Sequence, residues 1–178
     1  MADDQVLSKP DDELLEALFA LLQVRAQGAS AYGEDGSYAA LIRTLPVGLR
    51  AMAATHWLDL SLTLEDIGSH FLNFGEQGLV QETILGFREL GLLEFEPPFV
   101  EAFNLIHPIR HEVNGDNFDD YLETHGQAQR IQELNARIQE LNARPGEFVK
   151  QCDQVKDSAI YGAWIKYARA HPENVFDS

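Results

Sequence analysis

The stretch DDELLEALFALL, residues 11–22, decides the fold class of this chain. Its apolar side chains recur at steps of three and four residues, which is the spacing of one face of an α-helix; they are Leu14, Leu15, Leu18, Phe19 and Leu22. Three acidic residues come first, where the dipole of a helix favours negative charge. The stretch therefore predicts an amphipathic helix with one buried face.

Helical periods continue along the chain, and no segment shows the alternation typical of β-strands. Proline and glycine divide these periods into predicted helices over residues 38–44, 46–60, 79–90, 116–144 and 155–167, with a further element between Pro97-Pro98 and Asn114-Gly115. Asp116 is the expected cap of the long helix over 116–144. The chain has 178 residues, 45% of them hydrophobic, which suits one core. The sequence thus predicts an all-α fold: a compact single-domain multi-helix bundle over residues 1–178, with a long C-terminal helix pair.

Residues 130–143 are a tandem heptad, RIQELNA repeated once. Its apolar positions have the three-then-four spacing of a coiled-coil seam; they are Ile131, Leu134, Ile138 and Leu141. Two heptads are too short for an independent coiled coil. We therefore expect this seam to pack within the molecule, the alternative being self-association into a homodimer.

All of the excess negative charge lies in residues 1–126, which carry 22 Asp and Glu against 6 Lys and Arg. The last 52 residues carry seven of each, and the whole chain has a net charge of −16. Binding to DNA, RNA or an anionic membrane needs clustered Lys and Arg. The charge therefore argues against those partners and favours a basic protein, the alternative being that it only keeps the protein soluble.

The N-terminus and the cysteine content indicate a cytoplasmic protein. The start Met1-Ala2-Asp3-Asp4 lacks the basic and apolar regions of a secretory signal. A single cysteine, Cys152, excludes an intrachain disulfide. No uncharged apolar stretch approaches the roughly 20 residues that span a bilayer. We expect a cytoplasmic location and no membrane partner.

Two histidines four residues apart, His107 and His111, are the first candidates for a metal site. With Glu101 and Glu112 nearby, the pair could present two imidazoles on one helical face. However, Pro108 biases His107 away from helical geometry, and the HExxH pattern is missing.

His56, which lies beside Trp57 and Asp59, has two interpretations. One is a base positioned by a carboxylate. The other is a hydrogen-bonded packing residue, which is the commoner role of a histidine on an apolar helix face.

The remaining patterns for catalysis or ligand binding are incomplete. Asp116, Asp119 and Asp120 lack the spacing of a calcium loop. Cys152 has lysines nearby but no identifiable histidine partner. A phosphate-binding glycine motif is also missing. We therefore expect a protein that acts by binding, with no catalytic residue, metal or cofactor.

Several stretches within residues 38–112 have a familiar pattern: Leu45-Pro46 with Leu49-Arg50, ATHWLD at 54–59, FLN at 71–73 and GFRELG at 86–91, with a weaker echo in YARAHP at 167–172. Together they resemble a bacterial domain family typified by an acidic DNA-mimic protein. Members of that family usually carry Asn-Gly-Gly-Phe ahead of the Phe-x-Asn element, where this chain has LEDI at 64–67. The resemblance implies an all-helical cytosolic domain, and its best-described type presents carboxylates to a transcription regulator in place of DNA phosphates.

The positions of the carboxylates give the candidate partner-binding residues. On a helix, side chains three or four residues apart lie about 5–6 Å from one another, so acidic helices and loops can approximate a row of DNA phosphates. The candidates are Asp11, Asp12, Glu13 and Glu16; Glu34 and Asp35; and Glu112, Asp116, Asp119, Asp120 and Glu123. We expect them to bind the DNA-binding surface of a transcription regulator or nucleoid protein.

Two other functions remain open from the sequence. The first is a helical adaptor or immunity-type interaction protein that uses an apolar helix face, such as the heptad seam. The second is an enzyme with a metal near His107 and His111.

Overall fold

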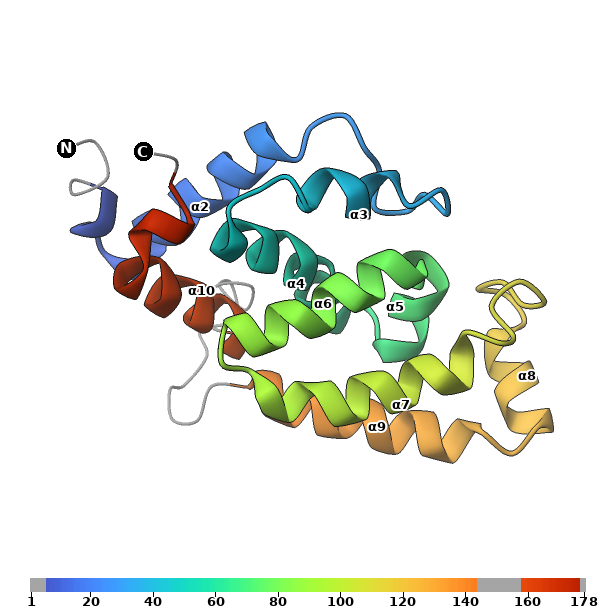
Figure 1. The fold of residues 1–178 in the computed structure, drawn as a ribbon. Helices are drawn as coiled ribbons and strands as arrows, with labels where there is room; N and C mark the ends of the chain where they lie inside the picture. Colours follow the sequence, from blue (N-terminus) through green and yellow to red (C-terminus); the bar gives the residue numbers. More distant parts are fainter. Residues whose placement is uncertain (1–5, 144–157, 177–178) are drawn as a thin grey trace.

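A computed structural model describes residues 6–143 and 158–176 of this chain. These residues form helices and short 3-10 turns, and the only β-type contact among them is an isolated bridge between Ala143 and Ser158. The expected all-α single-domain bundle is confirmed (Figure 1). The elements are α2 (Asp11–Arg25), α3 (Ser37–Ile42), α4 (Val47–Leu64), α5 (Ile67–Phe74), α6 (Gln77–Glu89), η1 (Leu93–Phe95), α7 (Glu96–Ile106), α8 (Phe118–Thr124), α9 (Ala128–Asn142), α10 (Ala159–Ala170) and η3 (Pro172–Asn174).

Helix α4 lies at the centre and packs against α3, α5, α6 and α10. In Figure 1, α2 and α3 lie on one side of α4 and α6, and α7 and α9 lie on the other. Helix α6 approaches α4 closely at Gly86, where a Cβ atom would lie 3.0 Å from the Ala51 carbonyl oxygen and 3.1 Å from Thr55 Cγ2. Glycine is therefore the residue that lets α6 approach α4 so closely.

Buried aromatic rings join the helices into one core. Phe99 of α7 packs 4.8 Å from Phe71 and 5.2 Å from Phe87, measured between ring centroids. Trp164 of α10 is fully buried, and its indole N–H donates to Thr55 Oγ1 of α4 over 3.0 Å. Burial of each such side chain contributes about 1.5–3 kcal/mol. The core therefore joins helices from both halves of the sequence.

The heptad seam packs inside the molecule, as expected. Ile131, Leu134 and Ile138 are buried and Leu141 is partly buried, and α9 contacts α5 and α7. The side chains of the seam are therefore already covered within the chain, and a homodimer or adaptor contact through them would have to displace this packing.

The two asparagines of the duplicated heptad perform the same task twice. Asn135 Oδ1 accepts a hydrogen bond from the N–H of Ile67, the first residue of α5. One heptad later, Asn142 Oδ1 accepts from the N–H of Ile160, in the first turn of α10. The first N–H groups of a helix have no partner within the helix. The repeat thus supplies acceptors to two helix starts.

The long helix expected over 116–144 is wrong, because the chain forms two helices there. Gly126 has φ +67° and separates α8 from α9. Asp116 does not cap α8 either. Asn117 holds the N-cap position, and the preceding turn is closed by Asn114 Oδ1, which accepts from the N–H of Asp116 over 2.9 Å.

The prolines expected to begin the element after residue 96 need a small correction, and other expectations concern residues that the structure does not describe. Pro97 and Pro98 lie within the first turn of α7 rather than before it, since proline is tolerated where a helix has no internal partner for its N–H groups. Pro145-Gly146, Cys152 and the expected start of the last helix at residue 155 lie outside the described residues. None of the described helices has the length and apolar character that crossing a bilayer requires.

Candidate acidic interface

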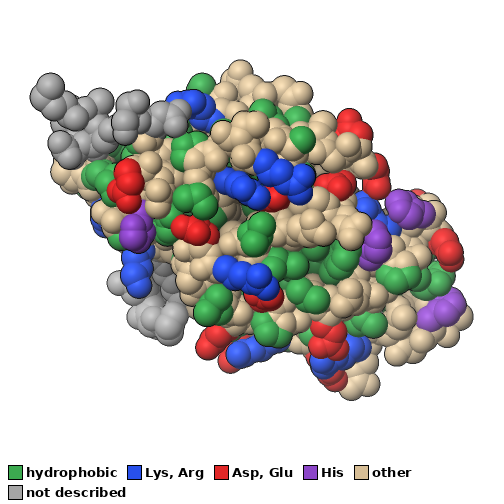
Figure 2. Space-filling model, viewed as in Figure 1, with side chains coloured by type: hydrophobic (Ala, Val, Ile, Leu, Met, Phe, Trp, Pro, Cys, Tyr) green, Lys and Arg blue, Asp and Glu red, His purple; other side chains and the backbone are tan. Residues whose placement is uncertain are grey.

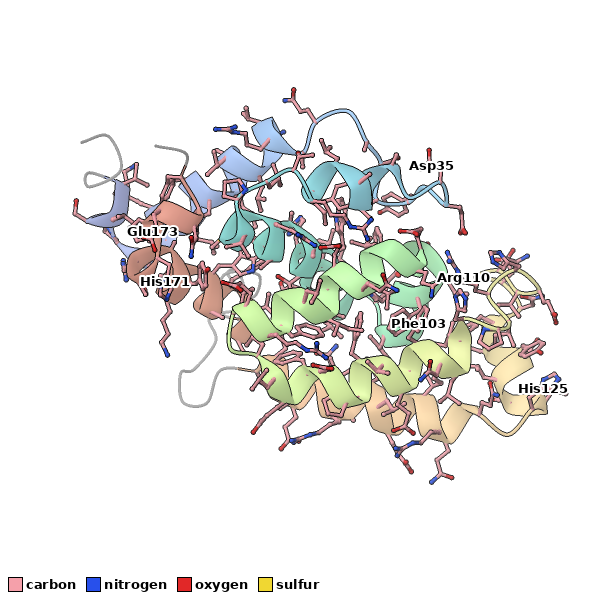
Figure 3. All side chains as sticks on the ribbon, in the orientation of Figure 1. Asp35, Phe103, Arg110, His125, His171 and Glu173 are labelled. Atoms are coloured by element: carbon pink, nitrogen blue, oxygen red, sulfur yellow. The ribbon has the colours of Figure 1, made fainter. Side chains whose placement is uncertain are left out.

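Three segments meet at the end of the molecule that carries α8. Arg110, which follows α7, is almost fully buried and forms an ion pair of 2.5 Å with Glu34, on the loop before α3. A Cβ atom at Gly75, between α5 and α6, would lie 3.1 Å from Arg110 Nε. Arg110 thus contacts both the α2–α3 loop and the α5–α6 turn, and joins them to the segment that follows α7. Figure 3 shows Asp35, Arg110 and His125 at this end, opposite His171 and Glu173.

Helix α8 is anchored by its apolar side. Phe118 is buried against Gly68 of α5, where a Cβ atom would lie only 2.6 Å from the Phe118 ring. Leu122 is buried one turn later. Because these two side chains face inward, the carboxylates of Asp119, Asp120 and Glu123 remain exposed.

Seven of the predicted partner-binding residues lie at this end, which we call the acidic end. All seven side chains are exposed: Glu34, Asp35, Glu112, Asp116, Asp119, Asp120 and Glu123. Within residues 107–124, Arg110 is the only Lys or Arg. The carboxylates from 112 to 123 form no ion pair with any residue that the structure describes. Glu34 is paired with Arg110, whereas the carboxylates from 112 to 123 are not neutralised by any described cation.

Asp35 is held in its charged form by its own loop. The side chain and the backbone N–H of Ser37 both hydrogen-bond the carboxylate and hold its pKa below the usual range. The backbone bond, from Ser37 N to Asp35 Oδ1, measures 3.0 Å.

The other four predicted residues lie at the opposite end, at the start of α2 beside α10 (Figure 1). Asp11 accepts from Arg169 Nη1 over 2.6 Å, and Glu13 lies 3.7 Å from Lys9 Nζ. Asp12 and Glu16 are exposed on the same helix. The structure thus separates these four residues from the acidic end and places cations beside two of them.

Between the two ends, acidic and basic side chains alternate. Figure 2 shows Lys and Arg among Asp and Glu on the face it presents, rather than an area of one sign. Glu82 is buried between Arg43 and Arg50, at 2.7 and 2.5 Å. Burial opposes its charge, yet the hydrogen bonds from Arg50 and Arg43 keep the pKa of Glu82 below its usual range. This buried carboxylate could not be predicted from the sequence, because its partners lie 32 and 39 residues away.

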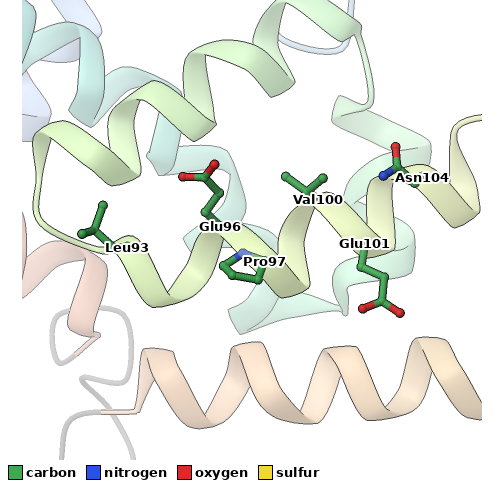
Figure 4. Close-up of a pocket in the computed structure, with 6 residues that line it drawn as sticks. All are labelled: Leu93, Glu96, Pro97, Val100, Glu101 and Asn104. Carbon is green, nitrogen blue, oxygen red and sulfur yellow. The ribbon is translucent and has the colours of Figure 1, made fainter.

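A shallow groove of about 420 Å³ runs along α7, lined by Leu93, Glu96, Pro97, Val100, Glu101 and Asn104 (Figure 4). In Figure 4, Glu96 points toward α6 and Glu101 toward α9. Glu96 pairs there with Arg88, and Glu101 accepts from Arg130 Nε over 2.6 Å. The carboxylates of this groove therefore connect helices and are already paired.

The two histidines of the predicted metal pair lie in different surroundings. His107 ends α7 and packs on Phe103, with ring centroids 4.6 Å apart, and His111 is exposed in the turns that follow. Among the described residues, no group of three or more His, Cys, Asp or Glu side chains is placed to hold a metal ion.

His56 is a hydrogen-bonded packing residue, and the interpretation as a base positioned by Asp59 is wrong. Its Nδ1 lies 3.0 Å from the hydroxyl of Tyr161. Asp59 is buried and accepts instead from Asn142 Nδ2 over 2.8 Å. Burial lowers the pKa of His56 to about 4. The stretch ATHWLD thus contacts α9 and α10 through its polar side chains.

Comparisons with protein-family models, curated proteins and solved structures find no match for this chain.

Proposed function

We propose that this protein is a cytoplasmic, acidic protein-binding module that acts as a DNA mimic. In this proposal, the acidic end occupies the DNA-binding surface of a basic transcription regulator or nucleoid protein. The observation that supports it is the convergence of seven exposed carboxylates on one end, where those from residue 112 to 123 form no ion pair with a described residue and Arg110, which pairs with Glu34, is buried.

The spacing of these carboxylates suits the DNA-binding surface of a partner protein. Duplex DNA presents one charge for roughly every 1.7 Å of its axis, and its protein partners carry Lys and Arg to match. Asp119 and Glu123 are four residues apart on α8, so their side chains are neighbours on its surface. Asp116 and Glu112 continue the charge into the preceding turn.

The anchoring of the acidic end supports the same function. Arg110 and Phe118 fix the loop and the helix that carry the carboxylates. A charged surface that is already ordered loses less entropy on binding, and it steers an oppositely charged partner toward it.

The family resemblance also favours this function. Where the chain departs from the family pattern, at LEDI, it carries two acidic residues close to the acidic end. In LEDI, Asp66 caps α5 by accepting from the N–H of Ser69 over 2.8 Å. A Cβ atom at Gly68 would lie 3.1 Å from Asp66 Oδ1 and 2.6 Å from Phe118 of α8. The exposed Glu65 precedes this cap. The acidic stretch therefore lies beside α8.

Charge reversal at either end tests the proposal. The variant Asp116→Lys/Asp119→Lys/Asp120→Lys changes the acidic end, and Asp11→Lys/Asp12→Lys/Glu13→Lys makes the same change in net charge at the start of α2. Each variant, and the unmodified protein, is immobilised and exposed to an extract of the native host, and circular dichroism checks that all three fold.

We expect basic DNA-binding proteins to be retained by the unmodified protein and by the α2 variant, and to be lost from the α8 variant. Equal retention by both variants would show that total charge, and not the acidic end, determines binding.

A further inference from the structure

A second feature of the molecule is a cavity of about 470 Å³ between α2, the segment that follows it and α4. Phe19 and Leu22 of α2 form one wall, and His56 and Trp57 of α4 form another. Ala29 lines the segment between α2 and α3. Cavities of about 300–1,000 Å³ with mainly apolar and aromatic walls are typical of small-molecule sites.

The lining of this cavity carries no Asp, Glu, Lys or Arg. The cavity is therefore uncharged, although the chain as a whole has a net charge of −16. The remaining polar groups of the lining come from Gln23, Gln27, Tyr38 and the two α4 side chains. Tyr38 is already engaged, because its hydroxyl donates to the Ala53 carbonyl over 3.3 Å. A charged ligand would find no opposite charge here and would lose its hydration.

His56 and Trp57 both have unused hydrogen-bonding capacity: Trp57 Nε1 is buried without a hydrogen-bond partner among the described residues, and His56 engages one ring nitrogen. Burial, and then the neighbouring Asp59, raise the pKa of the Tyr161 hydroxyl, so the phenol keeps its proton. His56 Nδ1 lies 3.0 Å from this hydroxyl and forms a hydrogen bond with it. The second ring nitrogen, Nε2, is left to hydrogen-bond a ligand, as a donor or an acceptor according to the tautomer. Nε2 has no partner among the described residues and is not sealed in the core.

Aromatic side chains surround this imidazole. The ring of Phe19 lies 5.7 Å from His56, and Trp57 lies 5.1 Å from it, between centroids. Trp57 in turn stacks on Phe74 at 5.0 Å and meets the exposed Tyr32 at 6.0 Å. Offset and edge-on contacts with such rings favour an aromatic ligand.

We propose that this cavity binds a neutral aromatic molecule that forms one hydrogen bond with His56 Nε2. The site lies in the α2–α4 wall, and it is independent of the acidic end.

The probe N-phenyl-1-naphthylamine tests this site, because it is neutral, has two aromatic groups and carries one N–H. Its fluorescence should rise on saturable binding of one molecule per chain. The matched probe 8-anilino-1-naphthalenesulfonate has the same rings with an added anion, and should bind at least about tenfold more weakly. Equal affinity for both probes would overturn the preference for a neutral ligand.

Variants of the lining locate the probe. Ala29→Phe fills the cavity and should abolish binding, whereas Ala40→Phe, on the exposed face of α3, should leave it unchanged. Gln27→Trp blocks the exposed rim without adding bulk to the core, and provides the test if Ala29→Phe fails to fold. His56→Phe keeps an aromatic ring and removes the hydrogen-bonding nitrogen, so affinity should fall by about fivefold. Undiminished binding by the folded blocking variants would contradict the proposal.

Discussion

Buried polar residues in this protein are held by partners that are distant in the sequence. Glu82 contacts Arg43 and Arg50, and Thr55 accepts from Trp164, which lies 109 residues later. Each of these contacts satisfies a polar group that would otherwise be costly to bury. The residues concerned therefore determine how α3, α4, α6 and α10 fit together.

Replacing Glu82 by Gln should lower the free energy of unfolding by about 1–3 kcal/mol, because the charge that both arginines contact is lost. Urea denaturation at neutral pH measures this change. Glu94→Gln is the matched control, since Glu94 is exposed and has no ion pair among the described residues; it should change stability by less than about 0.5 kcal/mol. Equal effects of the two substitutions would show that the buried position of Glu82 is not important.

His70 should make the protein less stable as the pH falls below neutral. Its ring is buried and its Nδ1 lies 3.0 Å from Ser61 Oγ, and burial lowers its pKa to about 3. An unfolded histidine has a pKa of about 6.5, so between pH 6.5 and 3 the unfolded chain binds the extra proton. Each pH unit in that window should cost up to about 1.4 kcal/mol.

The measurement is the slope of unfolding free energy between pH 6.5 and 5 for the unmodified protein and for His70→Phe. The variant should lose the part of the slope that His70 contributes. Asp59 acts in the opposite sense because burial raises its pKa, and the comparison cancels that contribution. Identical slopes would contradict the assignment.

At the scale of helices, α8 and α9 depend on one glycine. Gly126 has φ +67°, a conformation that is costly for residues with a Cβ atom, and the space around it is open. Gly126→Ala should therefore destabilise the protein by about 1 kcal/mol through the backbone alone. Gly115→Ala is the control, because Gly115 also faces open space but does not have positive φ.

Thermal unfolding of both alanine variants measures this difference. A lower Tm for Gly126→Ala than for Gly115→Ala is the expected result. Equal Tm values would show that the chain can continue through residue 126 without the left-handed turn.

Helix positions could be predicted from the sequence where the period was local. The stretch of residues 11–22 forms α2 with the expected buried leucines, and the heptad seam lies in α9. The division at Gly126 could not be predicted, because one glycine within a helix costs only about 1 kcal/mol and packing decides between a kink and a continuous helix. Here α9 packs along α7, and α8 diverges from it (Figure 1).

At the scale of the whole molecule, the negative charge is divided unevenly. Ion pairs neutralise Glu82, Glu96 and Glu101 in the middle, and Arg169 and Lys9 contact acidic residues at the start of α2. The acidic end keeps its carboxylates exposed. The sequence identified these charges, but their grouping depends on Arg110, which contacts Glu34 across 76 residues. Only the fold brings the two segments together.

The measurement that tests DNA mimicry most directly is competition on the immobilised protein. Proteins of the native host that bind to it are washed separately with duplex DNA and with high salt. We expect a DNA-binding protein to be released by both, because DNA phosphates compete for the surface that the acidic end covers and salt screens the attraction. A partner that resists both washes would contradict the proposal and would leave the net charge of −16 without a role in binding.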